Sequence, residues 1–184
     1  MTFYVAAGRL VNWVGNTQSD AAWREESWSA RGDRDEALAL FAGWHPQVRA
    51  LIAGTARVFK WALFDRPPLD TWTLGRVTLL GDAAHPMLPF LAQGAGQSIE
   101  DAFVLARCLA ADRDEPRRAL AAYAARRQQR TAAVQAASRN AGRQAQLADP
   151  AAVAERDARL AADPESVTAQ FDWIWGYDVA SAVS

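Results

Sequence analysis

Short apolar runs mark the first part of the chain. Residues 8–15 form one such run between two glycines, and residues 57–64 alternate apolar and polar side chains before a pair of prolines. Both patterns predict β-strands, because glycine and proline bound strands and successive side chains point to opposite faces. The second strand would place Phe59, Trp61 and Leu63 on one face. We expect that face to pack into a core; contact with an aromatic ligand is the alternative.

Helical spacing of apolar positions predicts the remaining elements on either side of the chain's centre. Residues 33–44 and 46–53 favour two short helices. Residues 116–147, rich in Ala and Arg, favour one long helix, and residues 151–160 favour another. The inner side of the long helix would carry Leu120, Tyr123 and Val134.

The end of the chain, residues 166–177, is predicted to be an aromatic tail. Three of its rings are expected to attach it to the body of the protein: Trp173, Trp175 and Tyr177.

Composition narrows the class of protein. The chain has 184 residues, of which 51% are hydrophobic and 22% charged, as in a globular domain. The net charge of −1 supplies no global basic field for nucleic acid or anionic lipid. No apolar run approaches the roughly 20 residues of a membrane helix, and no export signal is evident. One cysteine, Cys108, fits a reducing compartment, so we expect a cytoplasmic protein.

The arginines of the long helix have two interpretations. They could form a phosphate-binding face, or they could be a solvated helix surface. They are spread around the helix without interleaved aromatic side chains, which favours the solvated surface over a nucleic-acid groove. The arginines in question are Arg117, Arg118, Arg126, Arg127, Arg130, Arg139 and Arg143.

The segment 74–111 carries the candidate chemistry. Residues 77–80 are continuously apolar, which is typical of a strand covered on both faces. Gly81 then permits close approach of another molecule, and Asp82 places a carboxylate at the carboxyl end of the strand, where ligands of α/β folds bind. A carboxylate there can accept hydrogen bonds from sugar-like hydroxyls.

A proline-bearing loop and a helix start follow Asp82. Pro86 and Pro89 stiffen the loop and remove two backbone donors, so it can lie beside a planar ring. Gly94 and Gly96 permit close approach at the start of a helix, whose free N–H groups and positive dipole end favour an anion. The inward face of that helix is expected to carry Ile99, Ala102, Phe103, Ala106 and Leu109.

Other interpretations of these residues are weaker. His45 and His85 are too far apart to give a metal-ligand spacing, so no metal site is predicted, and His85 is expected to shape the loop through hydrogen bonds. A hydrolase triad of Ser98, His85 and Asp82 lacks a nucleophile elbow, and Ser98 fits a helix start better. Asp82 as a plain turn residue is the structural alternative.

Four short motifs follow one another in this segment: Gly81-Asp82-Ala83-Ala84-His85-Pro86, Pro89, Gly94-Ala95-Gly96 and Glu100-Asp101-Ala102. Together they resemble the second FAD-binding motif of class A flavoprotein monooxygenases, such as salicylate hydroxylase. The similarity extends to residues 64–68 and to Leu120, Tyr123, Arg127 and Arg130, and so covers most of the chain.

The resemblance implies a cofactor and a site. Asp82, after Gly81, would bind the ribityl chain of FAD, Pro89 would border the flavin ring, and Gly94, Ala95 and Gly96 would lie near its pyrimidine edge. It implies an oxidoreductase in which NAD(P)H reduces FAD and oxygen then hydroxylates an aromatic substrate, for which a salicylate-like phenolic acid is our expectation. No catalytic residue is assigned, and the sequence does not distinguish NADH from NADPH.

The chain also departs from the family pattern. It lacks the Gly-x-Gly-x-x-Gly fingerprint and the middle Asp-Gly motif. We therefore expect a truncated C-terminal portion, which either binds no FAD alone, as a non-catalytic remnant, or is half of a split flavoprotein; a missing N-terminal half or a homodimer is the expected partner.

The expected fold class is α+β, with a partial substrate-side sheet followed by a long helical C-terminal region. Residues 1–73 would form the partial sheet, 74–111 the FAD-motif strand, loop and helix, and 112–184 the C-terminal helices and aromatic tail.

Overall fold

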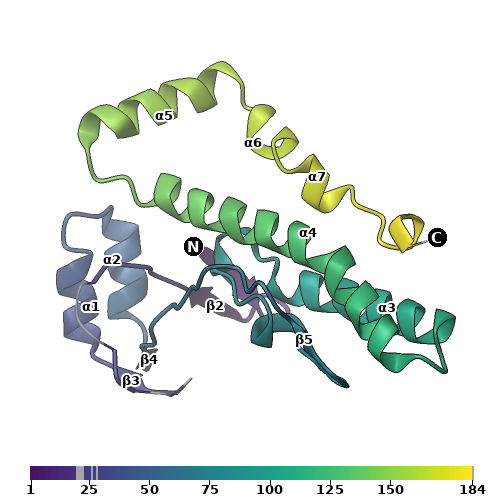
Figure 1. Cartoon of the computed structure of the whole chain (residues 1–184). Helices are drawn as coiled ribbons and strands as arrows, with labels where there is room; N and C mark the ends of the chain where they lie inside the picture. The colour runs from purple at the N-terminus through teal and green to yellow at the C-terminus, as the bar shows by residue number, and fades with distance from the viewer. Residues whose placement is uncertain (20–22, 26, 28, 184) are drawn as a thin grey trace. The chain divides into compact units, whose positions relative to one another are not determined.

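The computed structural model describes residues 1–19, 23–25, 27 and 29–183 (Figure 1). The chain divides into two compact units, Met1–Leu63 and Phe64–Ser184. The predicted sheet region 1–73 includes residues 20–22, 26 and 28, which lie outside the described residues. The predicted division at residues 73 and 111 stays a prediction.

The first unit consists of two small antiparallel ladders and two helices. Strand β1 (Thr2–Val5) pairs with β2 (Leu10–Trp13), and β3 (Arg31–Gly32) pairs with β4 (Val58–Phe59). Helix α1 (Arg34–Leu40) starts where the Asp33 side chain accepts hydrogen bonds from the N–H groups of Asp35 and Glu36. Helix α2 (Pro46–Ala53) has the predicted bounds, with proline in its first turn.

The strand predicted over residues 57–64 is much shorter than expected. Only Val58 and Phe59 pair with another strand. Phe59, Trp61 and Leu63 are 45%, 40% and 40% exposed, so the prediction that this face packs into a core is wrong for the chain as it stands. The reason is that a two-residue ladder in a small unit offers no second layer to cover the face.

The second unit begins with a hairpin and two short 3₁₀ turns. Strands β5 (Thr73–Leu74) and β6 (Val77–Thr78) pair antiparallel, followed by η1 (Gly81–Ala83) and η2 (Pro89–Leu91). Val77 is 68% exposed, so the prediction of a strand covered on both faces is wrong. With β5 as its only partner among the described residues, β6 presents its outer side chains to solvent.

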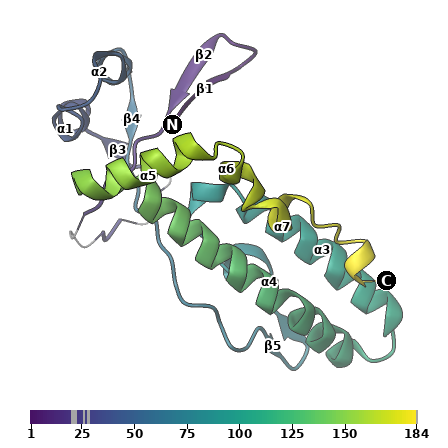
Figure 2. The same cartoon turned by 90° about the horizontal axis from the view of Figure 1, so that it is seen from above.

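Helices make up the rest of the second unit. Helices α3 (Gly94–Ala111) and α4 (Pro116–Ala145) lie side by side (Figures 1 and 2). Helix α5 (Pro150–Ala162), two one-turn helices and a final 3₁₀ turn follow: α6 (Ser166–Ala169), α7 (Asp172–Trp175) and η3 (Ser181–Val183). None of the helices described is both long and apolar enough to cross a membrane.

The core of the second unit lies between the hairpin, α3 and α4. Trp72, Val104 and Tyr123 are at its centre, and Tyr123 donates a hydrogen bond to the carbonyl of Leu79 over 3.2 Å. The predicted inner side of α4 is confirmed, since Leu120, Tyr123 and Val134 are all buried.

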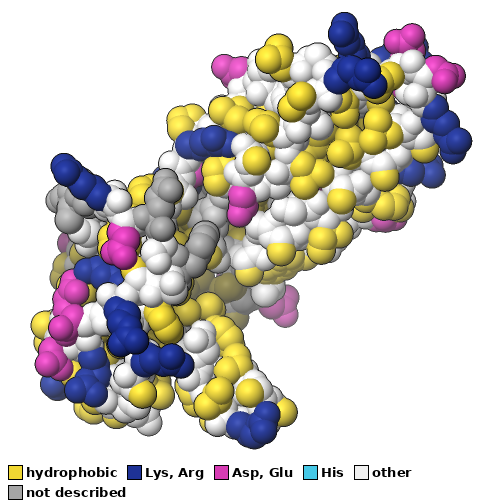
Figure 3. Space-filling model, turned by 90° about the horizontal axis from the view of Figure 1, so that it is seen from below, with side chains coloured by type: hydrophobic (Ala, Val, Ile, Leu, Met, Phe, Trp, Pro, Cys, Tyr) yellow, Lys and Arg dark blue, Asp and Glu magenta, His cyan; other side chains and the backbone are white. Residues whose placement is uncertain are grey.

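The predicted inward face of α3 is wrong. Ile99 is 71% exposed, and Phe103 and Leu109 are 38% and 39% exposed. The buried side of α3 consists instead of Gln97, Asp101, Val104 and Cys108. The helix turns its more polar side inward because charged groups of α4 bind there. Its apolar side belongs to a set of hydrophobic side chains left at the surface, and Figure 3 shows one face on which such side chains gather.

The aromatic tail is attached by fewer rings than expected. Trp173 and Trp175 are 44% and 53% exposed, so their predicted role is wrong, while Ile174 between them is buried. The ring of Tyr177 lies 3.6 Å from the guanidinium carbon of Arg130, which also donates hydrogen bonds to the carbonyls of Trp173 and Ile174. Tyr177 thus has the predicted attaching role, through a cation–π contact.

Candidate functional site

The turn at Gly81 requires glycine. Its φ is +61°, in the left-handed region that other residues rarely adopt. A Cβ atom there would lie 2.8 Å from the Oγ atom of Ser98. The Gly81 carbonyl accepts hydrogen bonds from the N–H groups of Ala84 and His85, over 2.8 and 2.9 Å, which closes the 3₁₀ turn. The close approach at Gly81 is therefore by Ser98 of α3, whereas the sequence analysis expected another molecule there.

A buried carboxylate on α3 holds this turn. The Asp101 Oδ2 atom accepts a hydrogen bond from the Gly81 N–H over 3.0 Å and lies 2.6 Å from the Nε2 atom of His85. Its Oδ1 atom accepts a hydrogen bond from the Nε atom of Arg127 over 2.7 Å. Asp101, His85 and Arg127 are all buried, so this one carboxylate joins the turn, the loop and α4.

Arg127 extends the network along α3. Its Nη1 atom donates to Glu100 over 2.6 Å and its Nη2 atom donates to the side chain of Gln97 over 2.8 Å. Arg130 pairs with the same Glu100 over 2.7 Å. The prediction of a solvated surface is therefore wrong for Arg127, because a buried guanidinium is tolerated when its donors are paired with carboxylates. Arg139 is less deeply buried than Arg127, and it pairs with Asp65.

The two carboxyls are stabilised in their ionised form. Burial alone raises the pKa of Asp101, but hydrogen bonds from His85, Arg127 and the Gly81 N–H outweigh it, so the net shift is below the ordinary value. Burial also raises the pKa of Glu100, but the hydrogen bonds from Arg130 and the charge of Arg127 lower it by more, so the net shift is again a decrease. At neutral pH both groups are therefore negative.

His85 has the structural role that the sequence predicted. An ionised Asp101 can only accept, so the Nε2 atom of His85 carries the proton of their 2.6 Å hydrogen bond. In the part of the chain that the structure describes, no group of three or more His, Cys, Asp or Glu side chains could hold a metal ion.

The alternative hydrolase triad is not assembled. His85 binds Asp101 rather than Asp82, and the Ser98 hydroxyl donates to the carbonyl of Gly94 over 2.9 Å. The helix-start interpretation of Ser98 is also wrong, because α3 begins at Gly94 and the Ser98 hydroxyl bonds back to a carbonyl one turn earlier instead of capping the helix.

The structure brings Asp82 close to Gly94, the first glycine of the pair. The position that a Cβ atom of Gly94 would occupy is 3.8 Å from the Oδ1 atom of Asp82. The start of α3 has no side-chain cap, so the N–H groups of its first turn, those of Gly94, Ala95 and Gly96, remain available. Asp82 is exposed. A carboxylate and a set of free N–H donors therefore adjoin at one place.

Pro89 lies on the neighbouring turn η2, which α4 fixes in place. The Ser138 hydroxyl donates to the carbonyl of Leu88 over 2.5 Å, and the Gln135 amide donates to the carbonyl of Pro86 over 2.7 Å. Pro89 itself is exposed. The loop is thus anchored from behind and leaves the proline accessible.

The network that holds the turn was not predicted from the sequence; its members are Gln97, Glu100, Asp101 and Arg127. A signal was present: Gln97, Asp101, Val104 and Cys108 are spaced at i, i+4, i+7 and i+11, which is one helix face. Two polar residues on that face made it look solvated, whereas Ile99 and Phe103 drew the inward prediction to the opposite side.

Comparison with known proteins gives the family. Residues 52–138 match a family described as FAD binding domain. The chain is 38% identical over 192 residues to salicylate hydroxylase of Pseudomonas putida, covering 100% of this chain and 43% of that protein. It superimposes on the structure of a salicylate hydroxylase substrate complex with a TM-score of 0.81 at 35% identity, covering 99% of this chain and 45% of that one. The chain belongs to the FAD-dependent aromatic hydroxylase family.

Other members of this flavoprotein family agree. A 3-amino-4-hydroxybenzoate 2-monooxygenase of Streptomyces platensis is 43% identical over 158 residues, covering 86% of this chain and 39% of that protein. The chain therefore spans about two fifths of the length of the curated relatives it matches. The predicted fold class is confirmed: the mixture of helices and small sheets matches part of a flavoprotein monooxygenase. FAD as the family's cofactor is also confirmed, and NAD(P)H is the co-substrate typical of the family.

Proposed function

We propose that this chain is the part of an aromatic hydroxylase that binds the ribityl chain and ring of FAD, through Asp82, Pro89 and Gly94 to Gly96. The proposal rests on one observation: the Asp82 carboxylate lies next to the uncapped start of α3. A carboxylate accepts from hydroxyl groups, and free N–H groups at a helix start stabilise negative charge.

The residues present fit FAD. Asp82 would accept hydrogen bonds from ribityl hydroxyls, and the N–H groups of Gly94, Ala95 and Gly96 would donate to the pyrimidine edge of the ring. Gly94 and Gly96 have no Cβ atom to keep the ring away from the backbone, and Pro89 offers an exposed surface without an N–H. When bound, FAD supplies the redox chemistry that couples NAD(P)H and oxygen to hydroxylation.

The proposed substrate is a phenolic acid. Relatives named as salicylate hydroxylase, 3-hydroxybenzoate 6-hydroxylase and 3-amino-4-hydroxybenzoate 2-monooxygenase support a hydroxylated benzoate. The family resemblance and the single buried thiol of Cys108 support a cytoplasmic location.

The exposed side of α3 supports the proposal that further residues complete the site. Ile99, Phe103 and Leu109 form an apolar strip there, and the relatives are more than twice as long as the chain. We propose a nucleotide-binding portion as the occupant of that strip, in the same or another polypeptide. A homodimer is the alternative occupant, and without either the chain would be a remnant that binds no FAD.

The first experiment is FAD binding by the purified chain, measured as flavin absorbance co-eluting in gel filtration. We expect Asp82→Ala to weaken binding, and the matched variant Asp114→Ala, also at an exposed carboxylate, to leave it unchanged. Equal binding by Asp82→Ala and the parent would contradict the ribityl role. If the parent chain binds no flavin, the family assignment is unaffected, and a site completed by a nucleotide-binding portion is favoured. The same variants are then compared for FAD binding after that portion is added.

A further inference from the structure

Gln93 is the residue directly before the glycines of the proposed flavin site, and its side chain lies beside them. The Gln93 Oε1 atom is 3.5 Å from the position that a Cβ atom of Gly96 would occupy. Gln93 is the N-cap residue of α3, but its side chain makes no capping hydrogen bond to the helix. Another partner therefore holds the Gln93 amide at the start of α3.

That partner is Gln97, one turn further along α3. The Gln97 Nε2 atom donates hydrogen bonds to Gln93 Oε1 over 3.3 Å and to Glu100 Oε1 over 3.0 Å. The Gln97 Oε1 atom accepts a hydrogen bond from Arg127 Nη2 over 2.8 Å. Gln97 is 0% exposed, so the amide that holds Gln93 is itself buried and paired at both ends.

The chemistry of these partners fixes the orientation of both amides. A guanidinium can only donate, so the Gln97 atom bonded to Arg127 is its oxygen. The Glu100 carboxyl has a lowered pKa and is ionised at neutral pH, so it can only accept, and the Gln97 atom bonded to it is the nitrogen. The Gln93 atom that faces this nitrogen is then an acceptor oxygen. This leaves the Gln93 Nε2 atom, with its two N–H groups, as the outer atom of the amide.

The Gln93 Nε2 atom is an accessible donor. Within the described residues it has no hydrogen-bond partner. The buried side-chain atoms without a partner in that part of the chain are Arg66 Nε, His85 Nδ1 and Gln135 Oε1, so solvent reaches Gln93 Nε2. Gln93 is half-buried, and its amide is oriented from behind by a buried neighbour. A donor held in this way is preorganised for a ligand at the surface.

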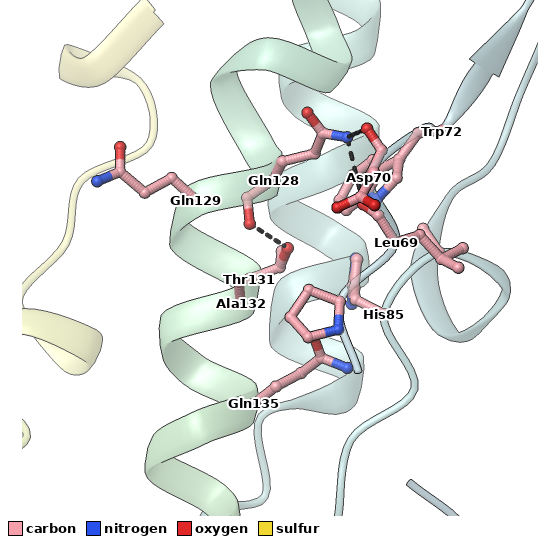
Figure 4. A pocket seen from close by; sticks show the side chains of 11 residues that line it. Leu69, Asp70, Trp72, His85, Gln128, Gln129, Thr131, Ala132 and Gln135 are labelled. Carbon is pink, nitrogen blue, oxygen red and sulfur yellow. Dashed lines mark hydrogen bonds between the residues drawn. The ribbon is translucent and has the colours of Figure 1, made fainter. Parts of the chain in front are cut away.

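This donor is separate from the cavity of about 300 Å³ that lies between α4 and the segment before the hairpin (Figure 4). Trp72, His85 and Gln135 belong to the lining of that cavity, and Gln93 does not. The Gln93 amide therefore serves the start of α3, where Gly94 and Gly96 lie.

We propose that Gln93 is a further flavin-binding residue, whose Nε2 atom donates a hydrogen bond to the pyrimidine edge of the ring beside the N–H groups of Gly94 to Gly96. The proposal rests on the proposed function, because it needs FAD at the start of α3. The pyrimidine edge carries acceptor oxygens and becomes more negative when the ring is reduced. A fixed donor there stabilises bound FAD and favours its reduction.

The test compares two variants of Gln93 for FAD affinity and for the reduction potential of bound FAD. Gln93→Glu keeps an oxygen for Gln97 and replaces the outer donor with an acceptor, whereas Gln93→Leu removes both groups. We expect Gln93→Leu to bind FAD about tenfold more weakly, as for the loss of one hydrogen bond, and Gln93→Glu to bind it more weakly still. The reduction potential should fall in both variants.

The matched control is Gln129→Leu. Gln129 is exposed on α4 and points away from His85 and Gln135 in Figure 4, so this variant should bind FAD as the parent does. If the chain alone binds no FAD, all variants are compared after the nucleotide-binding portion is added. An absence of FAD binding in that form as well would overturn both this proposal and the proposed function.

A second probe separates this proposal from the proposed function. Lumiflavin has the flavin ring but no ribityl chain, so Gln93→Glu should weaken its binding and Asp82→Ala should not. If Asp82→Ala weakens FAD binding while both Gln93 variants keep the parent's affinity and potential, Gln93 has no flavin role and the proposed function is unaffected. A loss in Gln93→Leu that Gln93→Glu does not share would also overturn the proposal, because it would show that Gln93 only supports Gln97.

Discussion

The backbone N–H of Gly81 donates a hydrogen bond to the Oδ2 atom of Asp101 over 3.0 Å. Through this contact, the turn that carries Asp82 is held by a residue two turns into α3. Because Asp101 also binds His85 and Arg127, its carboxylate connects the turn, the loop and α4. The turn that carries the exposed Asp82 is thus positioned by a buried carboxylate bonded to the residue directly before it.

Replacing this carboxylate should destabilise the chain. Asp101→Asn would remove one of the two carboxylates that pair with the buried Arg127, and the negative charge that faces His85, at a cost of about 3–5 kcal/mol in the free energy of unfolding. The matched variant Asp112→Asn breaks an ion pair in which the Arg118 side chain is 70% exposed, and should cost less than about 1 kcal/mol. Urea unfolding of both variants measures the difference. Equal losses would show that the buried network contributes little.

Acid should weaken the fold through the same groups. The ordinary pKa values are 3.8 for Asp101 and 4.5 for Glu100, and both are lowered in the folded chain. A lowered folded-state pKa adds stability above the unfolded-state pKa, and that stability is lost as the pH falls through the folded-state pKa. We expect stability to decline as the pH falls below about 4.5, with a shallower decline in Asp101→Asn. Unfolding curves across pH 3 to 7 give the slopes; an identical slope for parent and variant would contradict this assignment.

Gly81→Ala should be destabilising for a reason of backbone conformation. The left-handed φ of +61° costs a residue with a Cβ atom about 1–2 kcal/mol, and the contact with Ser98 Oγ adds to this. Adding Ser98→Ala removes the contact but not the backbone strain, so rescue should be partial. Gly43→Ala, where nothing lies within 4 Å of the added Cβ, is the control. Full rescue in thermal unfolding would refute the conformational explanation.

The Phe90 ring packs so closely against Gly142 that a larger residue at position 142 should destabilise the chain. A Cβ atom at Gly142 would lie 2.5 Å from the Phe90 ring, next to Pro89 on η2. Gly142→Ala should cost about 1–3 kcal/mol by overpacking, partly offset by a gain of about 1 kcal/mol in helix propensity. Phe90→Leu in the same chain should recover stability. A more stable Gly142→Ala variant would mean that the loop moves aside freely.

Local elements were predictable where the signal was local. Proline at the start of α2 and the Ala-rich composition of α4 depend on a residue's own turn of helix, and the structure has both helices close to the predicted places. The buried face of α4 followed from the periodicity of Leu120, Tyr123 and Val134. The turn at Gly81 and the helix start at Gly94 were likewise marked by residue type.

The sequence did not predict correctly which side chains of the strands and of α3 are buried. The apolar residues Ile99, Phe103 and Val77 were expected inside, but a side chain is buried only if another element covers it, and none of the described elements covers these three. Conversely, Arg127 was expected in solvent, and it became buried because Asp101 and Glu100 meet it from another helix.

The amino-acid sequence by itself determined the helices, the glycine-dependent turn, the motif residues and the family. Only the tertiary structure decided that Asp101 holds Gly81, that the polar side of α3 faces α4, and that Gln135 and His85 share a cavity. The physical reason is that backbone conformation depends on neighbours within a few residues. Pairing of buried charges depends on side chains brought together from positions more than twenty residues apart.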